Sequence, residues 1–351
     1  MKFTKVLFVT VLLIVATAFA NAPFAAIGHT QSEQQKPKDG QQKKDDKKEE
    51  PAQEEDGQAI KLGTQLVTVP FNVTDKKNRY INDLTKEDLE VLEDGKPQQI
   101  FSFERQTDLP ITIAMLIDIS GSQEYTLPQE KAAGARFFQK VLRPKKDLGA
   151  VVTFEHEAEL VQNLTDNVDK LQKALSEVTI GSPGAVLSRS GGTPPINNSG
   201  AGSTAMYDAI YSVSSDLLAR EAGRRVIILI SDGIDTSSRL KMRDAIQRTW
   251  RNEIIVYAIG IGDPAYGGIA QGDLKKIAAE TGGRAFFPRS EEDLDKAFAL
   301  IDEDLRSQYV LAYEPTNDAR DGSFRTIQVK AKNHKDLHIR HRRGYFAPKE
   351  T

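Results

Sequence analysis

Three oxygen-bearing side chains, Asp118, Ser120 and Ser122, stand at alternate positions where the apolar run 111–117 ends. An uninterrupted apolar run of this length is typical of a strand buried on both faces, and open α/β sheets bind ligands at the carboxyl ends of such strands. One carboxylate and two hydroxyls on a tight turn are the hard oxygen donors that suit Mg²⁺. Asp and Ser also favour turns because they hydrogen-bond the local backbone, so this motif alone is equally compatible with a simple turn.

Two later segments place the same kind of donor at the ends of other predicted elements. Thr204 follows a Gly-rich stretch and precedes apolar residues at helical spacing, which puts it at or beside a helix N-cap. Asp232 follows a second buried strand, 224–231, and Gly233 beside it permits a sharp turn. Each residue alone could be a cap or a turn former. Three matches in these contexts together favour a metal site.

The five residues form one ordered set: Asp118, Ser120, Ser122, Thr204 and Asp232. This set resembles the metal-ion-dependent adhesion site of von Willebrand factor A domains. The resemblance implies that the two serines and the threonine supply hydroxyls, that the aspartates act directly or through water, and that one coordination position stays open for a carboxylate of a partner protein. It also implies one divalent ion, Mg²⁺ or alternatively Mn²⁺ or Ca²⁺.

Asp208 lies four residues after Thr204, on the same face of the predicted helix. We expect it to be a capping residue or a hydrogen-bond partner of a ligand rather than a ligand itself. The Gly-, Ser- and Pro-rich segment 181–203 precedes Thr204 and is expected to form a long loop over the metal face. Such a loop could shape the ligand, shield the metal or be an inert insertion.

Helix-like and strand-like segments alternate through residues 108–306, which predicts a doubly wound, mostly parallel α/β sheet with helices on both faces. The sequence before and after this region, 60–107 and 307–348, reads as strands, and each stretch is too short to form a stable domain alone. We therefore expect the two flanks to pair into one small β-sandwich-like module that the α/β domain interrupts. Helices are predicted at 128–142, 167–178, 204–219, 239–252, 273–281 and 291–305, and further strands at 148–154, 158–164, 254–261 and 284–287.

The whole layout after the linker resembles exported bacterial proteins related to von Willebrand factor A domains. Besides the metal motif, the resemblance rests on four short segments: 83–88, 93–95, 308–313 and 343–345.

The first residues have the charged start and short apolar stretch of a secretory signal peptide, 1–20, with a small-residue cleavage site. The alternative is an uncleaved anchor, which would be the chain's one membrane contact. Residues 21–59 are rich in Gln, Lys and Glu and are expected to form a disordered linker. The expected location is therefore outside the cytoplasm: secreted, periplasmic or associated with the cell envelope.

The composition excludes several classes of function. The 351 residues contain no cysteine, so disulfides, thiolate catalysis and cysteine zinc sites are ruled out. Removing Lys2 and Lys5 with the leader takes the formal charge from −3 to −5, which gives no support for nucleic-acid binding.

No set of residues predicts an enzyme. The five histidines are distant in sequence from the metal motif, and no Gly-x-Ser-x-Gly elbow or phosphate-binding loop is present. His334, His338 and His341 could suggest zinc, but on a strand His338 and His341 point to opposite faces. The sequence therefore predicts an exported, metal-dependent protein-binding or adhesion module. A structural scaffold of an envelope assembly with a non-essential metal site is the alternative, and a hydrolase is the less favoured one.

Overall fold

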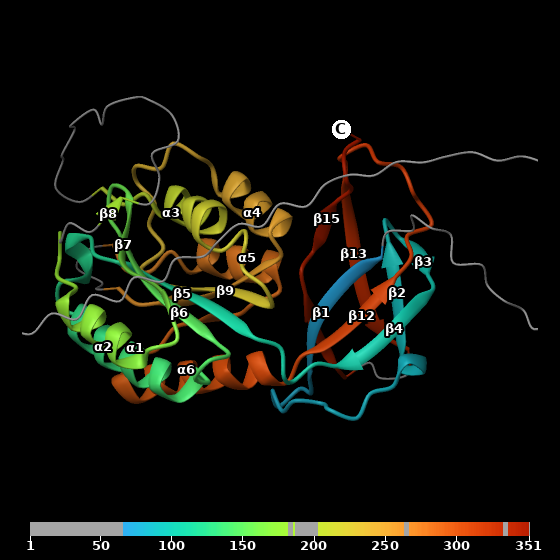
Figure 1. Ribbon diagram of the computed structural model, residues 1–351, viewed down its shortest axis with the longest axis horizontal. Helices are drawn as coiled ribbons and strands as arrows, with labels where there is room; N and C mark the ends of the chain where they lie inside the picture. Colours follow the sequence, from blue (N-terminus) through green and yellow to red (C-terminus); the bar gives the residue numbers. More distant parts are fainter. Residues whose placement is uncertain (1–65, 182–184, 187–202, 263–266, 333–335, 351) are drawn as a thin grey trace, which may run out of the picture. The chain divides into compact units, whose positions relative to one another are not determined.

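The computed structural model describes residues 66–181, 185–186, 203–262, 267–332 and 336–350, which form an α/β domain and a β module (Figure 1). The predicted signal peptide, the predicted linker and most of the loop 181–203 lie outside the described residues. Over the described ranges, no helix is both long enough and apolar enough to cross a membrane.

A mostly parallel sheet forms the centre of the α/β domain, as predicted. Its seven strands lie in the order β11-β10-β9-β5-β6-β7-β8. β7 runs antiparallel to both of its neighbours, β6 and β8, and all other neighbouring pairs are parallel. The four inner strands β10, β9, β5 and β6 are buried almost throughout, which explains their continuous apolar sequences. The strands are β5 (Ile111–Asp118), β6 (Leu148–Phe154), β7 (Ala158–Thr165), β8 (Ala185–Val186), β9 (Arg224–Ser231), β10 (Ile254–Gly260) and β11 (Ala285–Phe286).

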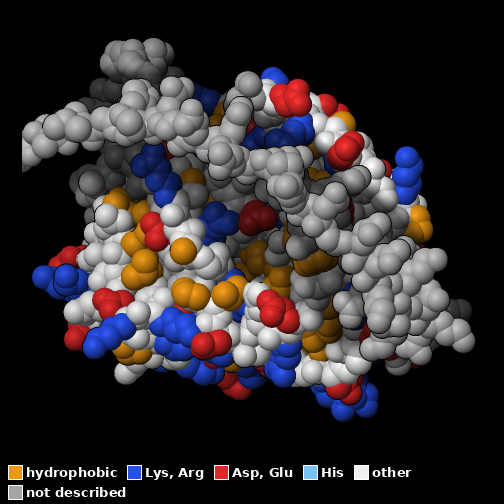
Figure 2. Space-filling model, turned by 45° about the vertical axis from the view of Figure 1, so that its right-hand side comes forward, with side chains coloured by type: hydrophobic (Ala, Val, Ile, Leu, Met, Phe, Trp, Pro, Cys, Tyr) orange, Lys and Arg blue, Asp and Glu red, His pale blue; other side chains and the backbone are white. Residues whose placement is uncertain are grey.

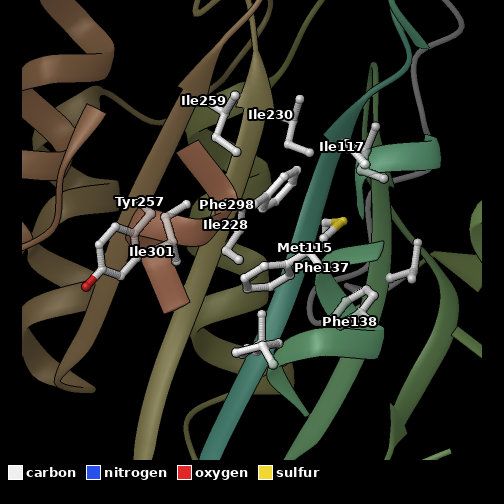
Figure 3. Close-up of a cluster of buried hydrophobic side chains, with 14 of the residues drawn as sticks. Met115, Ile117, Phe137, Phe138, Ile228, Ile230, Tyr257, Ile259, Phe298 and Ile301 are labelled. Carbon is white, nitrogen blue, oxygen red and sulfur yellow. The ribbon is translucent and has the colours of Figure 1, made fainter. Parts of the chain in front are cut away.

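Helices cover both faces of this sheet. Along β5, Met115 and Ile117 face one helical layer while Ala114 and Leu116 face the other, because successive strand residues point to opposite sides. Figure 3 shows the first of these two cores, in which aromatic side chains of α1 and α6 pack on the strands. The first layer comprises α1 (Leu127–Val141), α2 (Val168–Glu177) and α6 (Glu291–Arg306), and the second α3 (Met206–Ser212), α4 (Met242–Arg251) and α5 (Gln271–Thr281).

The helix predicted at 204–219 differs from the expectation at both ends. It begins as α3 at Met206, because Ala205 has non-helical backbone angles, φ −105° and ψ 61°. It then continues as the π-helical segment η3 (Val213–Leu217). There, the N–H of Leu218 donates to the carbonyl of Val213 at 3.0 Å, five residues back.

The two flanks of the chain pair with each other, as predicted, in two four-stranded antiparallel sheets of the orders β14-β1-β12-β4 and β15-β13-β2-β3. The short 3₁₀ helix η1 (Lys86–Asp88) begins with the capping box of Thr85 and Asp88. The strands are β1 (Val67–Thr74), β2 (Leu89–Glu93), β3 (Lys96–Gln98), β4 (Ile100–Arg105), β12 (Tyr309–Tyr313), β13 (Phe324–Ala331), β14 (His338–His341) and β15 (Gly344–Phe346).

Buried contacts join the β module to the α/β domain. The guanidinium of Arg224, at the start of β9, donates to the carbonyls of Gln106 and Leu305, which lie on the two connections between the domains. The indole of Trp250 at the end of α4 stacks on the ring of Phe324 in β13, with centroids 4.5 Å apart. The α/β domain is thus held to the β module through both of its chain connections and through a helix end.

Candidate metal centre

Asp118 is the last residue of β5, and its carboxylate is fully buried. The hydroxyl of Ser231 donates to its Oδ2 at 2.6 Å, and the backbone N–H of Ser120 donates to its Oδ1 at 3.0 Å. Burial raises the pKa of Asp118 to about 6; hydrogen bonds from Ser120 and Ser231 oppose this rise, and the negative charge of Asp232 adds to it. A buried carboxylate held in this way is poised to be stabilised by a cation.

Further hydrogen bonds connect the loop after β5 with the end of β9. They involve Ser120, Ser122 and Asp232. The two serine hydroxyl oxygens lie 3.1 Å apart, and the hydroxyl of Ser122 donates to Asp232 Oδ2 at 2.6 Å. Asp232, directly after β9, accepts the backbone N–H of Ile234 on its other oxygen at 2.9 Å. Hydrogen bonds therefore link four of the five predicted ligand residues.

Thr204 is placed by its backbone rather than by its side chain. Its N–H donates to Thr236 Oγ1 at 2.8 Å, and its carbonyl accepts the N–H of Thr236 at 2.9 Å. The next residue, Ala205, donates to the carbonyl of Glu155 just after β6. These bonds hold Thr204 between the loops that follow β6 and β9, and among the described residues its hydroxyl has no hydrogen-bond partner.

Asp208 lies away from this hydrogen-bonded cluster. Its two carboxylate oxygens accept the backbone N–H groups of Arg239 and Leu240, at 3.0 and 2.9 Å. Asp208 thus fixes the segment that leads into α4.

Several residues that support the site were not singled out from the sequence. Ser231 orients Asp118, Thr236 clamps Thr204, and Gln123 donates to the hydroxyl of Ser122 at 3.4 Å. Asp235 accepts the N–H of Tyr207 at 3.0 Å and so fixes the start of α3. Ser231 could have been found from its position beside Asp232 at the end of a buried strand, whereas the others carry no local signal.

The donor set consists of oxygen atoms alone. Across the described ranges, no three His, Cys, Asp or Glu side chains come close enough to hold one ion, so a metal here would need the hydroxyl oxygens as well as Asp118 and Asp232. Two buried carboxylates and three hydroxyls fit a hard cation such as Mg²⁺ or Ca²⁺ and offer nothing for a soft one.

The histidines do not form a second centre within the described region. His341 accepts the N–H of Val329 at Nε2, 3.1 Å away, and its Nδ1 lies 2.7 Å from the carbonyl oxygen of Arg342. Burial lowers the pKa of His341. Its neutral ring therefore serves the packing of β14 against β13. His338 is exposed on the same strand, and His29 and His334 lie outside the described residues.

Comparison with solved structures returns proteins of low sequence identity. A von Willebrand factor type A protein from Catenulispora acidiphila is 15% identical, with a TM-score of 0.44, over 79% of this chain and 72% of that one. An aerotolerance-related membrane protein from Bacteroides fragilis, with multiple mutations to serines, is 15% identical, with a TM-score of 0.41, over 56% of this chain and 98% of that one.

Proximal thread matrix protein 1 from the mussel byssus, solved with a zinc-occupied metal-ion-dependent adhesion site, is 19% identical, with a TM-score of 0.46. That similarity covers 60% of this chain and 48% of the mussel chain. No curated protein matches the chain.

The family comparison covers more than half of the sequence. Residues 112–300 match the family described as von Willebrand factor type A domain. This range runs from β5 to α6 and contains all five residues of the candidate metal centre. The chain therefore belongs to the von Willebrand factor type A domain family.

Proposed function

We propose that this protein is an exported binding module that captures a partner protein through a divalent cation held by Asp118, Ser120, Ser122, Thr204 and Asp232. Domains of the von Willebrand factor A family are commonly metal-dependent protein-interaction modules. In the proposed complex the cation, Mg²⁺ or a similar hard ion, has one position open, and an Asp or Glu carboxylate of the partner fills it.

The observation that carries this proposal is the pair of buried carboxylates joined through serine hydroxyls. The hydroxyl of Ser122 donates to Asp232 and lies beside the hydroxyl of Ser120, whose backbone N–H donates to Asp118. The pKa of Asp118, at the end of β5, is raised. Two acids in one buried cluster repel each other when ionised, and a divalent cation between them removes that repulsion. The free hydroxyl of Thr204 supplies a further neutral donor.

The rim of the site offers a surface for a protein partner. Tyr125, on the turn between Ser122 and α1, leaves 68% of its surface exposed although it is a large aromatic residue. Exposed tyrosines beside a polar anchor are typical of protein-binding surfaces. On the face drawn in Figure 2, side chains of both charge signs are interspersed, in keeping with a protein partner rather than a nucleic acid.

The proposed location outside the cytoplasm rests on the amino-terminal sequence, residues 1–20, and on the polar linker that follows it.

A capture experiment tests the proposal. The wild-type chain and the variants Asp118→Ala and Thr204→Ala are immobilised and exposed to a native surface extract in Mg²⁺ or in EDTA. We expect one set of proteins to be lost in EDTA and with both variants, and to be kept with the control variant Asp216→Asn, which changes a carboxylate on η3 away from the five ligands. Melting curves confirm that each variant is folded. Capture that is indifferent to EDTA and to both site variants contradicts the proposal and favours a scaffold role.

A further inference from the structure

A third acid interacts with the candidate cation site and has no hydrogen-bond partner for its carboxyl group among the described residues. Glu130, on α1, is fully buried, and among the described residues neither of its carboxylate oxygens has a hydrogen-bond partner. An ionised carboxylate buried without a partner costs several kcal/mol, so proteins either neutralise such a group or supply a positive charge. The surroundings of Glu130 therefore indicate what it does.

A chain of hydrogen bonds links the backbone of Glu130, though not its carboxyl group, to the site. The backbone N–H of Glu130 donates to the carbonyl of Thr126 at 3.1 Å, one helical turn earlier. The hydroxyl of Thr126 donates to Gln123 Oε1 at 3.0 Å, and Gln123 Nε2 donates to the hydroxyl of Ser122 at 3.4 Å. Ser122 in turn donates to Asp232. Gln123 is itself fully buried, and Ser122 and Thr126 on either side of it are partly buried.

The charges that act on Glu130 are all negative. Burial raises its pKa to about 8, and the negative charges of Asp118 and Asp232 add to that rise. The Thr126 hydroxyl opposes the rise from nearby, although it donates its hydrogen bond to Gln123 and not to Glu130. Within the described part of the chain, no basic side chain offsets these charges. Lys131, the next residue of α1, donates to the carbonyls of Ser176 and Val178 at the end of α2.

The charged groups on α6 are also committed elsewhere. Glu291 and Asp295 of that helix pair with Arg136 on the exposed side of α1, at 2.9 Å each. The basic residues of α6 pair within that helix, Lys296 with Glu292 and Asp293, and Arg306 with Asp302. Lys170 and Lys173 of α2 are exposed, so none of these cations compensates the buried charge of Glu130.

We propose that Glu130 is a third, proton-linked acid of the cation site: it carries a proton while the site holds no cation and gives up that proton when a divalent cation binds. The O–H bond of the carboxyl breaks, the electron pair stays on the carboxylate, and the proton passes to solvent. Glu130 acts through its charge and not as a ligand, because it is not close enough to share an ion with Asp118 and Asp232. The inference rests on the proposed function, since it requires a cation at the site.

The consequence is that cation affinity depends on pH. The loaded site binds fewer protons than the empty one, so the affinity rises with pH until Glu130 is already ionised in the empty protein. Below about pH 8, one proton is released for each cation bound. We therefore expect the dissociation constant of the cation to fall nearly tenfold for each unit by which the pH rises.

Calorimetric titration of the full chain with Mn²⁺ tests the inference. Titrations at pH 7 in PIPES and in Tris, which have different ionisation enthalpies, give the number of protons released. For a group with the pKa of Glu130 we expect about 0.9 proton to come from this residue at pH 7. Glu130→Gln, which keeps the shape of the neutral acid, should still bind Mn²⁺. It should release about 0.9 proton fewer than the wild type does. Asp216→Asn, a control carboxyl whose pKa is also raised by burial, should release as many protons as the wild type.

Each outcome is decisive. Equal proton release by the wild type and Glu130→Gln overturns the inference and leaves the proposed function intact. Absence of Mn²⁺ binding by the wild type overturns the proposed function, and the inference with it. If Glu130→Gln does not fold, the wild type alone decides: release that declines toward zero between pH 7 and pH 9 supports the inference, and constant release over that range overturns it.

Discussion

Ser231→Ala is the sharpest test of how the fold prepares Asp118. The Ser231 hydroxyl donates to the buried Asp118 carboxylate at 2.6 Å and accepts the N–H of Gly233 at 2.9 Å, so both of its bonds lie inside the site. A hydrogen bond to a charged group contributes about 1.5–3 kcal/mol, and replacing a partner that orients a metal ligand costs about 10- to 100-fold in metal affinity. We expect the Mn²⁺ dissociation constant to rise at least about tenfold, which corresponds to about 1.4 kcal/mol.

The matched control for this variant is Ser214→Ala. Ser214 is equally buried and also donates a short hydrogen bond, at 2.6 Å to the carbonyl of Ile210, but both residues lie within the helix that follows Thr204. Calorimetric titration with Mn²⁺ measures binding, and urea unfolding without metal measures stability. The control should lose at most about 1 kcal/mol of stability and keep its affinity. The reasoning is refuted if Ser231→Ala binds Mn²⁺ as tightly as the wild type does.

Two further variants test the framework around the site. Gly233→Ala should lower the free energy of unfolding by about 1–3 kcal/mol, as urea titration would show, because Gly233 has φ +79° and an added Cβ would lie 2.6 Å from Leu274 Cγ; unchanged stability would contradict this. Asp147→Asn should lose about 2 kcal/mol at pH 7, because Asp147 accepts hydrogen bonds from the Arg143 side chain and the N–H of Ile111. Burial raises the pKa of Asp147, but these hydrogen bonds outweigh burial and lower the pKa overall. The stabilisation that the bonds give is therefore present above about pH 4 and is lost as the pH falls further. The free energies of unfolding of wild type and variant should therefore converge between pH 7 and pH 3. A difference in free energy that stays constant over this range would contradict the assignment.

The fold was largely predictable because its strands carry unambiguous patterns. β5 and β9 are continuous apolar runs that end in polar residues, and the structure places both at the centre of a mostly parallel sheet. The pairing of the flanks followed from a different argument, since neither flank alone could bury enough apolar surface. The register of β1 with β12, which pairs Val67 with Tyr313, could not be predicted from the alternation of apolar and polar residues. The strands of the module share that alternation, so it does not distinguish one register from another.

The candidate site was predictable only as far as it follows local sequence rules. Asp118 and Asp232 each end a buried strand, and a strand end is visible in a sequence. Thr236 and Gln123 are different, because each supports the site through a contact made across a loop. Glu130 is the extreme case: on a helix predicted from the sequence, a glutamate between Gln129 and Lys131 is taken for a solvated position. Only the packing of α1 on the sheet shows that its carboxylate is enclosed.

The direction of the parallel strands sets where a partner can approach. β5 starts at Ile111, beside the connections that Arg224 anchors, and ends at Asp118. The seven residue steps from Ile111 to Asp118 span about 23 Å, so the candidate cation site and the junction with the β module lie at opposite ends of the parallel strands. The contact of Trp250 with Phe324 belongs to the junction end as well, because α4 runs back against the strands. A partner carboxylate that reaches the proposed cation would therefore approach at the carboxyl end of β5, opposite the junction with the β module.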